Sequence, residues 1–140
     1  MTAEHVHSVL VVEDDPDIQM LLTTVLSGSG FDSVAASDGQ SGVELFSSND
    51  PCVVLLDVGL PVLDGWEVLS RIRESSNVPV IMLTAHGMET DREKGIAAGA
   101  NEYLVKPFGK TELLSRIRDV LDRSISSDVL AGERPEIGCS

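Results

Sequence analysis

The 140-residue sequence predicts an α/β fold in which five parallel strands form a doubly wound sheet with helices on both faces. Short apolar runs rich in β-branched residues alternate with amphipathic segments, and this alternation is typical of parallel strands joined by helices. Two of the runs, at 52–57 and 78–83, are continuously apolar, as expected of central strands covered on both faces. The predicted strands span residues 6–12, 33–36, 52–57, 78–83 and 103–105.

The first predicted helix directly follows the first strand. Asp15 is placed to cap it, and Pro16 is placed at its first helical position, where the missing N–H leaves no hydrogen bond unmade. Apolar residues then recur at a spacing near 3.6, which predicts one buried face. The predicted face consists of Ile18, Leu21, Leu22, Val25 and Leu26, and Gly28 and Gly30 end the helix.

Two further helices are predicted between the second and fourth strands. The segment 38–46 is amphipathic, and the Asn-Asp-Pro sequence at 49–51 stops it before the third strand. The segment 64–73 has Asp64 in position to cap a helix. Its apolar residues at helical spacing, Trp66, Leu69 and Ile72, predict one buried face.

The C-terminal part of the chain contains two helical segments of different character. The segment 88–100 has two glycines and few large apolar residues, so we expect thin burial and low local stability, which suits a conformational switch. The segment 110–123 is a regular amphipathic helix, and residues 124–140 are predicted to form a flexible tail or linker. One domain is therefore expected at 7–123, after a short N-terminal extension at 1–6.

Composition excludes several classes of function. The net charge of −13 would repel a phosphate backbone, which disfavours direct binding to nucleic acid. No apolar run approaches the roughly 20 residues needed to cross a bilayer, and the N-terminus lacks a signal-peptide pattern. We therefore expect a cytoplasmic protein without membrane contact. Cys52 and Cys139 form neither a disulfide framework nor a metal-ligand spacing.

Polar residues occur where four of the predicted strands end. They are Glu13 and Asp14 after the first strand, Asp57 at the end of the third, Thr84 after the fourth and Lys106 after the fifth. With a strand order of 2-1-3-4-5, these ends lie side by side at the ligand-binding edge of the sheet. Clustered carboxylates need a shared cation, and an oxygen-only ligand set suits Mg²⁺. Such a site matches what phosphoryl transfer requires, with Asp57 as the best placed nucleophile.

Each of these residues has a simpler interpretation when it is taken alone. A single acidic residue after a strand is more often a turn residue or a helix cap, and only the coincidence at four neighbouring strand ends favours a site. Asp15, before Pro16, is better explained as a cap, and so is Asp64. His5 and His7 lack a third ligand, so a metal site there is disfavoured.

Four ordered motifs together resemble the receiver domain of two-component response regulators. They are VLVVEDDP at 9–16, LLDVGLPVLDG at 55–65, VIMLTA at 80–85 and GANEYLVKPF at 99–108, and the resemblance extends over about residues 7–123. It implies a flavodoxin-like (βα)5 fold and a signalling switch that catalyses only its own phosphorylation and dephosphorylation. It also implies that a histidine kinase or a phosphotransfer protein is the phosphoryl donor.

The resemblance assigns a role to each residue of the cluster. Asp57 resembles the phosphoacceptor, and Glu13 and Asp14 resemble the acidic pair that binds Mg²⁺, for which Mn²⁺ is an alternative. The backbone carbonyl of Gly59 resembles a further metal ligand beside Asp57. The remaining residues resemble the phosphoryl-binding and switching groups: Thr84 and Lys106 at the phosphoryl oxygens, Tyr103 as the switching aromatic, and Lys106–Pro107 as a cis peptide bond.

The resemblance further implies an output face formed by the fourth helix, the fifth strand and the fifth helix. The segment 99–108 is similar to OmpR/PhoB-type regulators, which pair through this face, so a homodimer is an expected partner. Asn101 stands where an acidic residue is common in that group. The chain is then either a stand-alone regulator or the receiver of a larger one, transcriptional regulators included.

Two alternatives to a phosphorylated receiver were compared with the sequence. A haloacid-dehalogenase-like phosphatase needs a second Asp two residues after its nucleophile, and Gly59 occupies that position. A pseudo-receiver that acts only as an interaction module is expected to lack Asp14, Asp57 or Lys106, and all three are present. At Ile18, contact with a kinase and ordinary core packing remain equally open.

Overall fold

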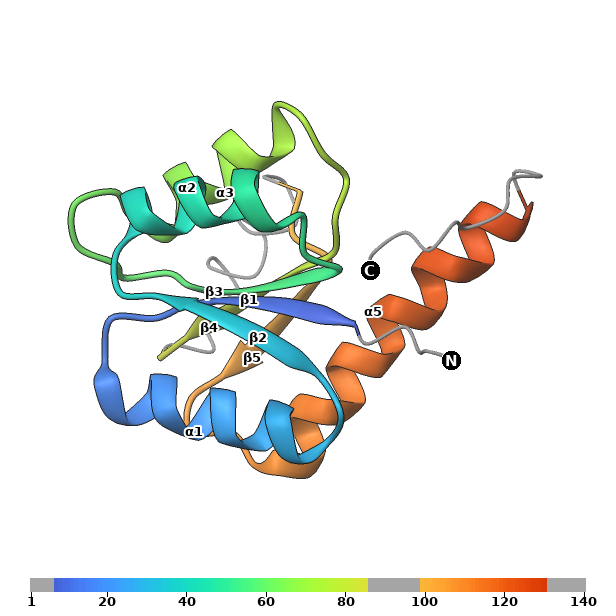
Figure 1. The fold of residues 1–140 in the computed structure, drawn as a ribbon, viewed down its shortest axis with the longest axis horizontal. Helices are drawn as coiled ribbons and strands as arrows, with labels where there is room; N and C mark the ends of the chain where they lie inside the picture. Colours follow the sequence, from blue (N-terminus) through green and yellow to red (C-terminus); the bar gives the residue numbers. More distant parts are fainter. Residues whose placement is uncertain (1–6, 86–98, 131–140) are drawn as a thin grey trace.

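The computed structural model describes residues 7–85 and 99–130, with side chains described up to Asp122. It confirms the predicted sheet, in which all strands are parallel and their order is β2-β1-β3-β4-β5 (Figure 1). The strands are β1 (Ser8–Val12), β2 (Asp32–Ala36), β3 (Val53–Asp57), β4 (Val80–Thr84) and β5 (Glu102–Val105).

Helices cover both faces of this sheet (Figure 1). They are α1 (Pro16–Gly28), α2 (Gly39–Asn49), α3 (Gly65–Arg73) and α5 (Lys110–Leu130). One face lies against α1 and α5, and the other lies against α2 and α3. The helix predicted at 88–100 falls mostly on residues 86–98, outside the described ranges. Gly99 and Ala100, its last two residues, are not helical and lead directly into β5.

Both predicted helix caps, Asp15 and Asp64, are confirmed, and Asp38 caps α2 in the same way. The Asp15 carboxylate accepts hydrogen bonds from the backbone N–H groups of Asp17 and Ile18. Asp38 and Asp64 accept equivalent bonds in the first turns of α2 and α3. Each cap satisfies backbone donors that have no acceptor within the helix, which is why a short acidic side chain ends the preceding loop at these points.

Several predicted boundaries were wrong by a few residues. The fourth strand begins at Val80 and not at residue 78, because Pro79 has no N–H to donate, and it continues to Thr84, which pairs with Val105. The helix α2 continues past residue 46 and ends at Asp50 in the left-handed conformation. The helix α5 does not stop at residue 123, because no Gly or Pro interrupts it and extending an existing helix costs little.

Each face of the sheet has its own apolar core. The three central strands β1, β3 and β4 are wholly buried or nearly so, which for β3 and β4 confirms the interpretation of their continuous apolar runs. Alternate residues point to opposite faces. Val9, Val11, Leu55 and Leu83 pack with α1 and α5, whereas Leu10, Val12, Leu56 and Met82 pack with α2 and α3. The rigid two-sided core holds the strand ends in place.

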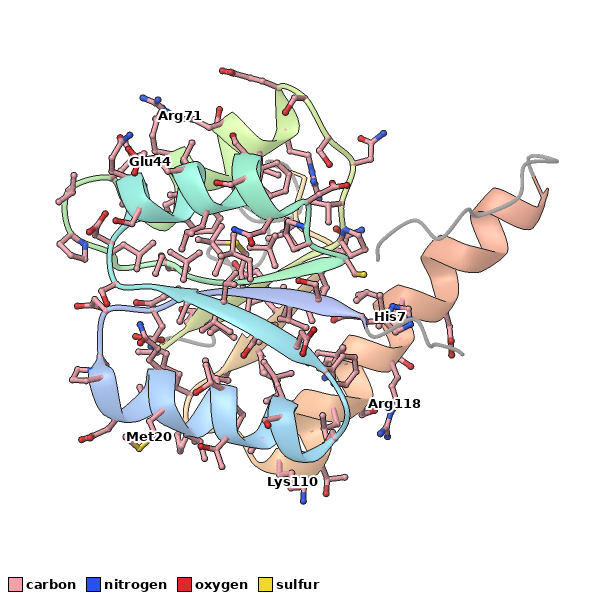
Figure 2. All side chains as sticks on the ribbon, in the orientation of Figure 1. His7, Met20, Glu44, Arg71, Lys110 and Arg118 are labelled. Carbon is pink, nitrogen blue, oxygen red and sulfur yellow. The ribbon has the colours of Figure 1, made fainter. Side chains whose placement is uncertain are left out.

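The predicted buried face of α1 needs one correction. Leu22 and Leu26 are fully buried, and Ile18 and Val25 pack partly against the core, as the spacing predicts. Leu21 is exposed instead, together with its neighbour Met20, which lies on the outer side of α1 (Figure 2). The buried face is centred on Leu22 and Leu26, and Leu21 lies at the far edge of the apolar stripe from them. Within the described residues, each helix is too short or too polar to cross a lipid bilayer.

Candidate functional site

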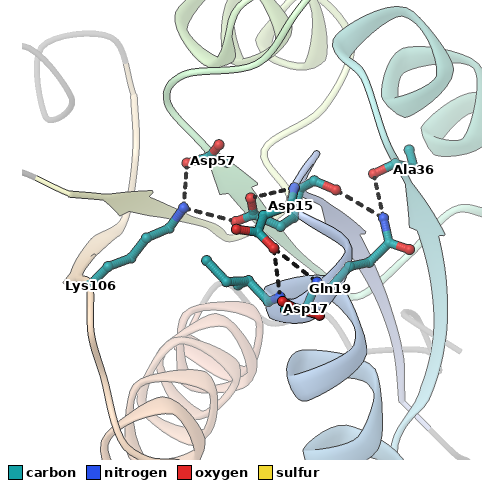
Figure 3. Close-up of polar contacts among 8 residues, drawn as sticks. Asp15, Asp17, Gln19, Ala36, Asp57 and Lys106 are labelled. Carbon is teal, nitrogen blue, oxygen red and sulfur yellow. Dashed lines mark hydrogen bonds and ion pairs between the residues drawn. The ribbon is translucent and has the colours of Figure 1, made fainter.

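Three of the predicted site residues meet through direct contacts at the carboxyl edge of the sheet. Glu13 follows β1, Asp57 ends β3 and Lys106 follows β5. The Lys106 ammonium lies 3.0 Å from Glu13 Oε1 and 3.0 Å from Asp57 Oδ1 (Figure 3). The Glu13 and Asp57 side chains are 1% and 9% exposed, so both ion pairs are shielded from water.

Burial and pairing act in opposite directions on the charges of this cluster. Burial raises the pKa of Glu13, and the hydrogen bonds from Lys106 and the Asp15 N–H only partly offset it. Burial also disfavours the Lys106 ammonium, but its hydrogen bonds to Asp57 and Glu13 outweigh this effect and raise its pKa. Lys106 is therefore a fixed positive charge between two carboxylates.

Asp14 completes an acidic group at this edge. Carboxylate oxygens of Glu13, Asp14 and Asp57 all lie within 4.8 Å of one another. Asp14 is exposed whereas the other two are buried, so water has access to one side of the group. Three oxygen donors with room for water are the ligand set that Mg²⁺ or Mn²⁺ prefers, whereas zinc and copper sites draw on imidazole or thiolate ligands. The residues present thus fit the predicted metal.

Comparison with known proteins identifies the family of this chain. The sequence model of the response regulator receiver domain matches residues 9–118. The chain belongs to the response regulator receiver family. This finding agrees with the sheet order, the acidic group and the lysine described above, and it confirms the resemblance seen in the sequence.

Relatives and solved structures support this assignment. The chain is 48% identical over 116 residues to the probable transcriptional regulator ycf27 of Guillardia theta, covering 83% of this chain and 46% of that protein. Among solved structures, the Francisella response regulator 1452 receiver domain has a TM-score of 0.80 at 33% identity, covering 84% of this chain and 98% of that one. This chain spans about half the length of the transcriptional regulators that it matches.

One solved neighbour was determined with a metal ion. The receiver domain of the sensor histidine kinase PA1611 from Pseudomonas aeruginosa has a magnesium ion coordinated in its active site cleft. It is 35% identical to this receiver with a TM-score of 0.74, and the match covers 84% of this chain and 96% of that one.

The loop after Asp57 is held by two close backbone approaches. A Cβ at Gly65 would overlap the backbone carbonyl of Asp57, and a Cβ at Gly39 would overlap that of Leu63. These glycines let α3 and α2 approach the loop that follows Asp57. Gly59, in the same loop, is exposed and has open space around it. The ligand role of its carbonyl stays a prediction.

Thr84 and Tyr103 occupy neighbouring strands of the receiver, as their predicted switching role requires. Thr84 ends β4 and is 2% exposed. Tyr103 lies in β5, where it pairs with Met82 of β4, and its ring packs in the core that faces α2 and α3. The Lys106–Pro107 peptide bond is cis. The coupling between Thr84 and Tyr103 stays a prediction.

One residue beside the acidic group had no signal in the sequence. The side-chain amide of Gln19, in the first turns of α1, donates hydrogen bonds to the backbone carbonyls of Glu13 and Ala36 (Figure 3). Asp15, by contrast, caps α1 as predicted. Nothing in the spacing of a Gln six residues after Glu13 distinguishes it from an exposed helical Gln, so only the packed structure could identify it.

Proposed function

We propose that this receiver accepts a phosphoryl group on Asp57 from the phosphohistidine of a histidine kinase or a phosphotransfer protein. The observation that supports this most directly is the position of Asp57. Its carboxylate lies 3.0 Å from the Lys106 ammonium and within reach of two further carboxylates that could share a cation with it. A nucleophile, a fixed positive charge and oxygen ligands for a divalent ion are the groups that phosphoryl transfer requires.

The proposed transfer needs no proton from the receiver. A carboxylate oxygen of Asp57 attacks the phosphorus of the phosphohistidine, and the new O–P bond forms as the N–P bond breaks. The electron pair of the broken bond stays on the imidazole of the donor. Lys106 stabilises the negative oxygens of the phosphoryl group, because its ammonium already lies at the Asp57 carboxylate.

The carboxylates of Glu13, Asp14 and Asp57, with the carbonyl of Gly59, would hold the divalent ion, which we propose to be Mg²⁺, with Mn²⁺ as a substitute. Such an ion neutralises charge on the phosphoryl oxygens. Glu13 and Asp57 are buried and preorganised, whereas Asp14 is open to water. The divalent ion and the phosphoryl donor would therefore reach the acidic group from its exposed side, at Asp14.

The signal is proposed to leave through Thr84, Tyr103 and the face formed by β5, α5 and the segment between β4 and β5. The Thr84 hydroxyl would bind a phosphoryl oxygen, and its displacement would alter the packing of Tyr103 in the neighbouring strand. On this face, Arg116 of α5 pairs with Glu102 of β5 at 3.0 Å and lies 4.0 Å from Glu112. We propose that a second copy of the chain or a downstream partner binds there.

The chain is proposed to act in the cytoplasm as a switch rather than as an enzyme on other substrates. Residues 7–123 would form the receiver, with 1–6 as an extension and 124–140 as a tail or linker, the first part of which continues α5 as far as Leu130. The matched relatives are transcriptional regulators about twice as long, so we propose a transcriptional output as the receiver part of a larger regulator, with a stand-alone regulator as the alternative.

Phosphorylation with a small-molecule donor tests the function. The chain is incubated with acetyl phosphate and Mg²⁺, and its intact mass is compared with that of Asp57→Asn. Asp50→Asn is the matched control, because Asp50 is exposed and Asn tolerates its left-handed backbone. We expect one phosphoryl group on the wild type and on Asp50→Asn, and none on Asp57→Asn. Equal labelling of Asp57→Asn would refute the assignment, and an unlabelled wild type would support the pseudo-receiver alternative.

A further inference from the structure

Gln19 joins the ends of two strands at the point where they separate. The last residue pair of β1 and β2 is Val12 with Ala36, and the Glu13 N–H still donates to the Ala36 carbonyl at 3.0 Å. Beyond this bond the chains diverge into separate loops. Gln19 Nε2 lies 2.9 Å from the Glu13 carbonyl oxygen, 3.2 Å from the Ala36 carbonyl oxygen and 3.3 Å from Ser37 Oγ.

The carbonyl of Glu13 needs such a donor. Glu13 is completely buried, so water does not reach its backbone oxygen. A buried carbonyl without a hydrogen bond is strongly unfavourable. Because the strand ladder has already ended, the side-chain amide of Gln19 takes the place of the next backbone donor. Two amide hydrogens serve the two carbonyls at the end of β1 and β2.

The backbone of Glu13 is therefore held on both sides. Its N–H is bonded to Ala36, its carbonyl is bonded to Gln19, and its own carboxylate Oε2 accepts a bond from the Asp15 N–H at 3.1 Å. Asp14 lies between these fixed points. Of the three restraints, the Gln19 bond is made by a side chain outside the acidic group, so it can be removed without altering any carboxylate.

We propose that Gln19 is a positioning residue of the acidic site, which holds the turn at residues 13–15 so that the Glu13 and Asp14 carboxylates converge on Asp57. The inference rests on the proposed function, in which the converging carboxylates bind a divalent cation. Loss of a group that hydrogen-bonds to metal ligands and orients them commonly lowers metal affinity by about 10- to 100-fold.

The test compares Mg²⁺ affinity by calorimetry in the wild type, Gln19→Leu and Gln40→Leu, at a temperature at which circular dichroism shows all of them folded. Gln19→Leu removes both donors with little change in size. Gln40→Leu is the matched control, because the Gln40 amide bonds to Glu44 on the exposed side of its own helix. We expect Gln19→Leu to weaken Mg²⁺ binding about tenfold, and Gln40→Leu to leave it unchanged.

Hydrogen exchange provides a second readout. The Asp15 amide should exchange faster in Gln19→Leu than in the wild type without Mg²⁺, because the turn it belongs to is released. If Gln19→Leu does not fold, Gln19→Asn is used, which keeps the amide but is too short to reach both carbonyls.

The outcomes separate this inference from the proposed function. A Gln19 variant that unfolds at a lower temperature but binds Mg²⁺ as tightly as the wild type would show a structural tether only and would overturn the inference. A wild type that does not bind Mg²⁺ would refute the proposed metal site, and the inference with it. Mg²⁺ binding by the wild type and by Gln40→Leu, with weaker Mg²⁺ binding by the Gln19 variant, supports both the metal site and the positioning role of Gln19.

Discussion

The ammonium of Lys106 lies 3.0 Å from the carboxylate of Glu13, although 92 residues separate them in the sequence and Glu13 is almost fully buried. Lys106 also contacts Asp57 at the same distance, so one cation balances two carboxylates at the edge of the sheet. A divalent ion bound to the same carboxylates would compete with this ammonium for their oxygens. The relationship between Glu13 and Lys106 therefore leads to the first two predictions.

Replacement of Lys106 by Met should destabilise the protein mainly in the absence of metal. Loss of the ammonium leaves two buried carboxylates uncompensated, which costs about 3 kcal/mol for a buried ion pair. Bound Mg²⁺ replaces the missing charge and stabilises by linkage. Urea unfolding with EDTA and with saturating Mg²⁺ should show a clearly smaller loss in Mg²⁺, whereas an equal loss in both buffers would contradict the shared-cation arrangement.

Replacement of Glu13 by Gln should have a pH-dependent effect on stability in metal-free buffer. Burial raises the pKa of Glu13 in the folded state above its ordinary value of 4.5, so the folded protein binds this proton more tightly than the unfolded chain. As pH rises from the ordinary pKa of 4.5 to the higher pKa of the folded state, Glu13 therefore lowers the free energy of unfolding of the wild type. Glu13→Gln should match the wild type at low pH and become the more stable protein near neutral pH. A stability difference that does not change with pH would contradict this prediction.

Arg73 should be important for the stability of the sheet edge opposite the acidic site. Its guanidinium donates to the carbonyls of Ser76, Val78 and Gly99 and to the side chain of Asn101. It thereby ties the end of α3 to the starts of β4 and β5.

We expect Arg73→Ala to lower the free energy of unfolding by about 3 kcal/mol, since hydrogen bonds to a charged group contribute about 1.5–3 kcal/mol each and several acceptors are left partly buried. Arg73→Lys should retain only part of the bonding. Arg71→Ala is the control, because Arg71 makes an exposed ion pair with Glu67 that contributes about 0.5 kcal/mol or less to the free energy of unfolding. Urea denaturation measures all three variants, and equal losses for Arg71→Ala and Arg73→Ala would contradict the prediction.

Val62 should be a site at which a substitution stabilises the protein. Its φ is 67°, in the left-handed region that a β-branched residue rarely adopts, and the Leu63 N–H donates to the Pro61 carbonyl across it at 2.7 Å. The side chain is 80% exposed, so its removal loses little packing.

Val62→Gly should raise the free energy of unfolding by about 1 kcal/mol, because glycine has no Cβ and adopts positive φ without strain. Val62→Ala keeps an ordinary Cβ in the strained conformation and should gain less. Thermal unfolding ranks the three proteins, and a loss of stability in Val62→Gly would show that the valine side chain makes a stabilising contact.

The close approach at Gly65 predicts a contrast with Gly59 in the same loop. A Cβ at Gly65 would overlap the Asp57 carbonyl, whereas a Cβ at Gly59 would meet open space. Gly65→Ala should cost about 2 kcal/mol or more and slow labelling by acetyl phosphate, because the end of β3 that carries Asp57 must shift. Gly59→Ala should stay within about 0.5 kcal/mol of the wild type. Similar stabilities for the two variants would mean that α3 can move without disturbing Asp57.

Much of the fold was predictable because its signals are local in the sequence. Continuous apolar runs marked the central strands, and Asp15, Asp38 and Asp64 precede helices that they cap. The residues of the acidic site stand at strand ends, and the rule that parallel strands share a carboxyl edge was enough to place them together. Predictions failed at Leu21, whose exposure depends on how α1 packs, and at the end of α5, where no Gly or Pro stops a helix that is easily extended.

The sequence by itself determined the sheet, its central strands, the helix caps and the identity of the acidic group, because these depend on residue type and on spacing over a few positions. The tertiary structure alone decided that Lys106 lies between Glu13 and Asp57, that Gln19 bonds to the Glu13 carbonyl and that Arg73 joins α3 to Gly99. These contacts join residues from different elements of the fold, and their partners are often backbone carbonyls, which every residue possesses. A hydrogen bond to a carbonyl leaves no pattern in the sequence, so its existence depends on where the packed core brings the two chain segments.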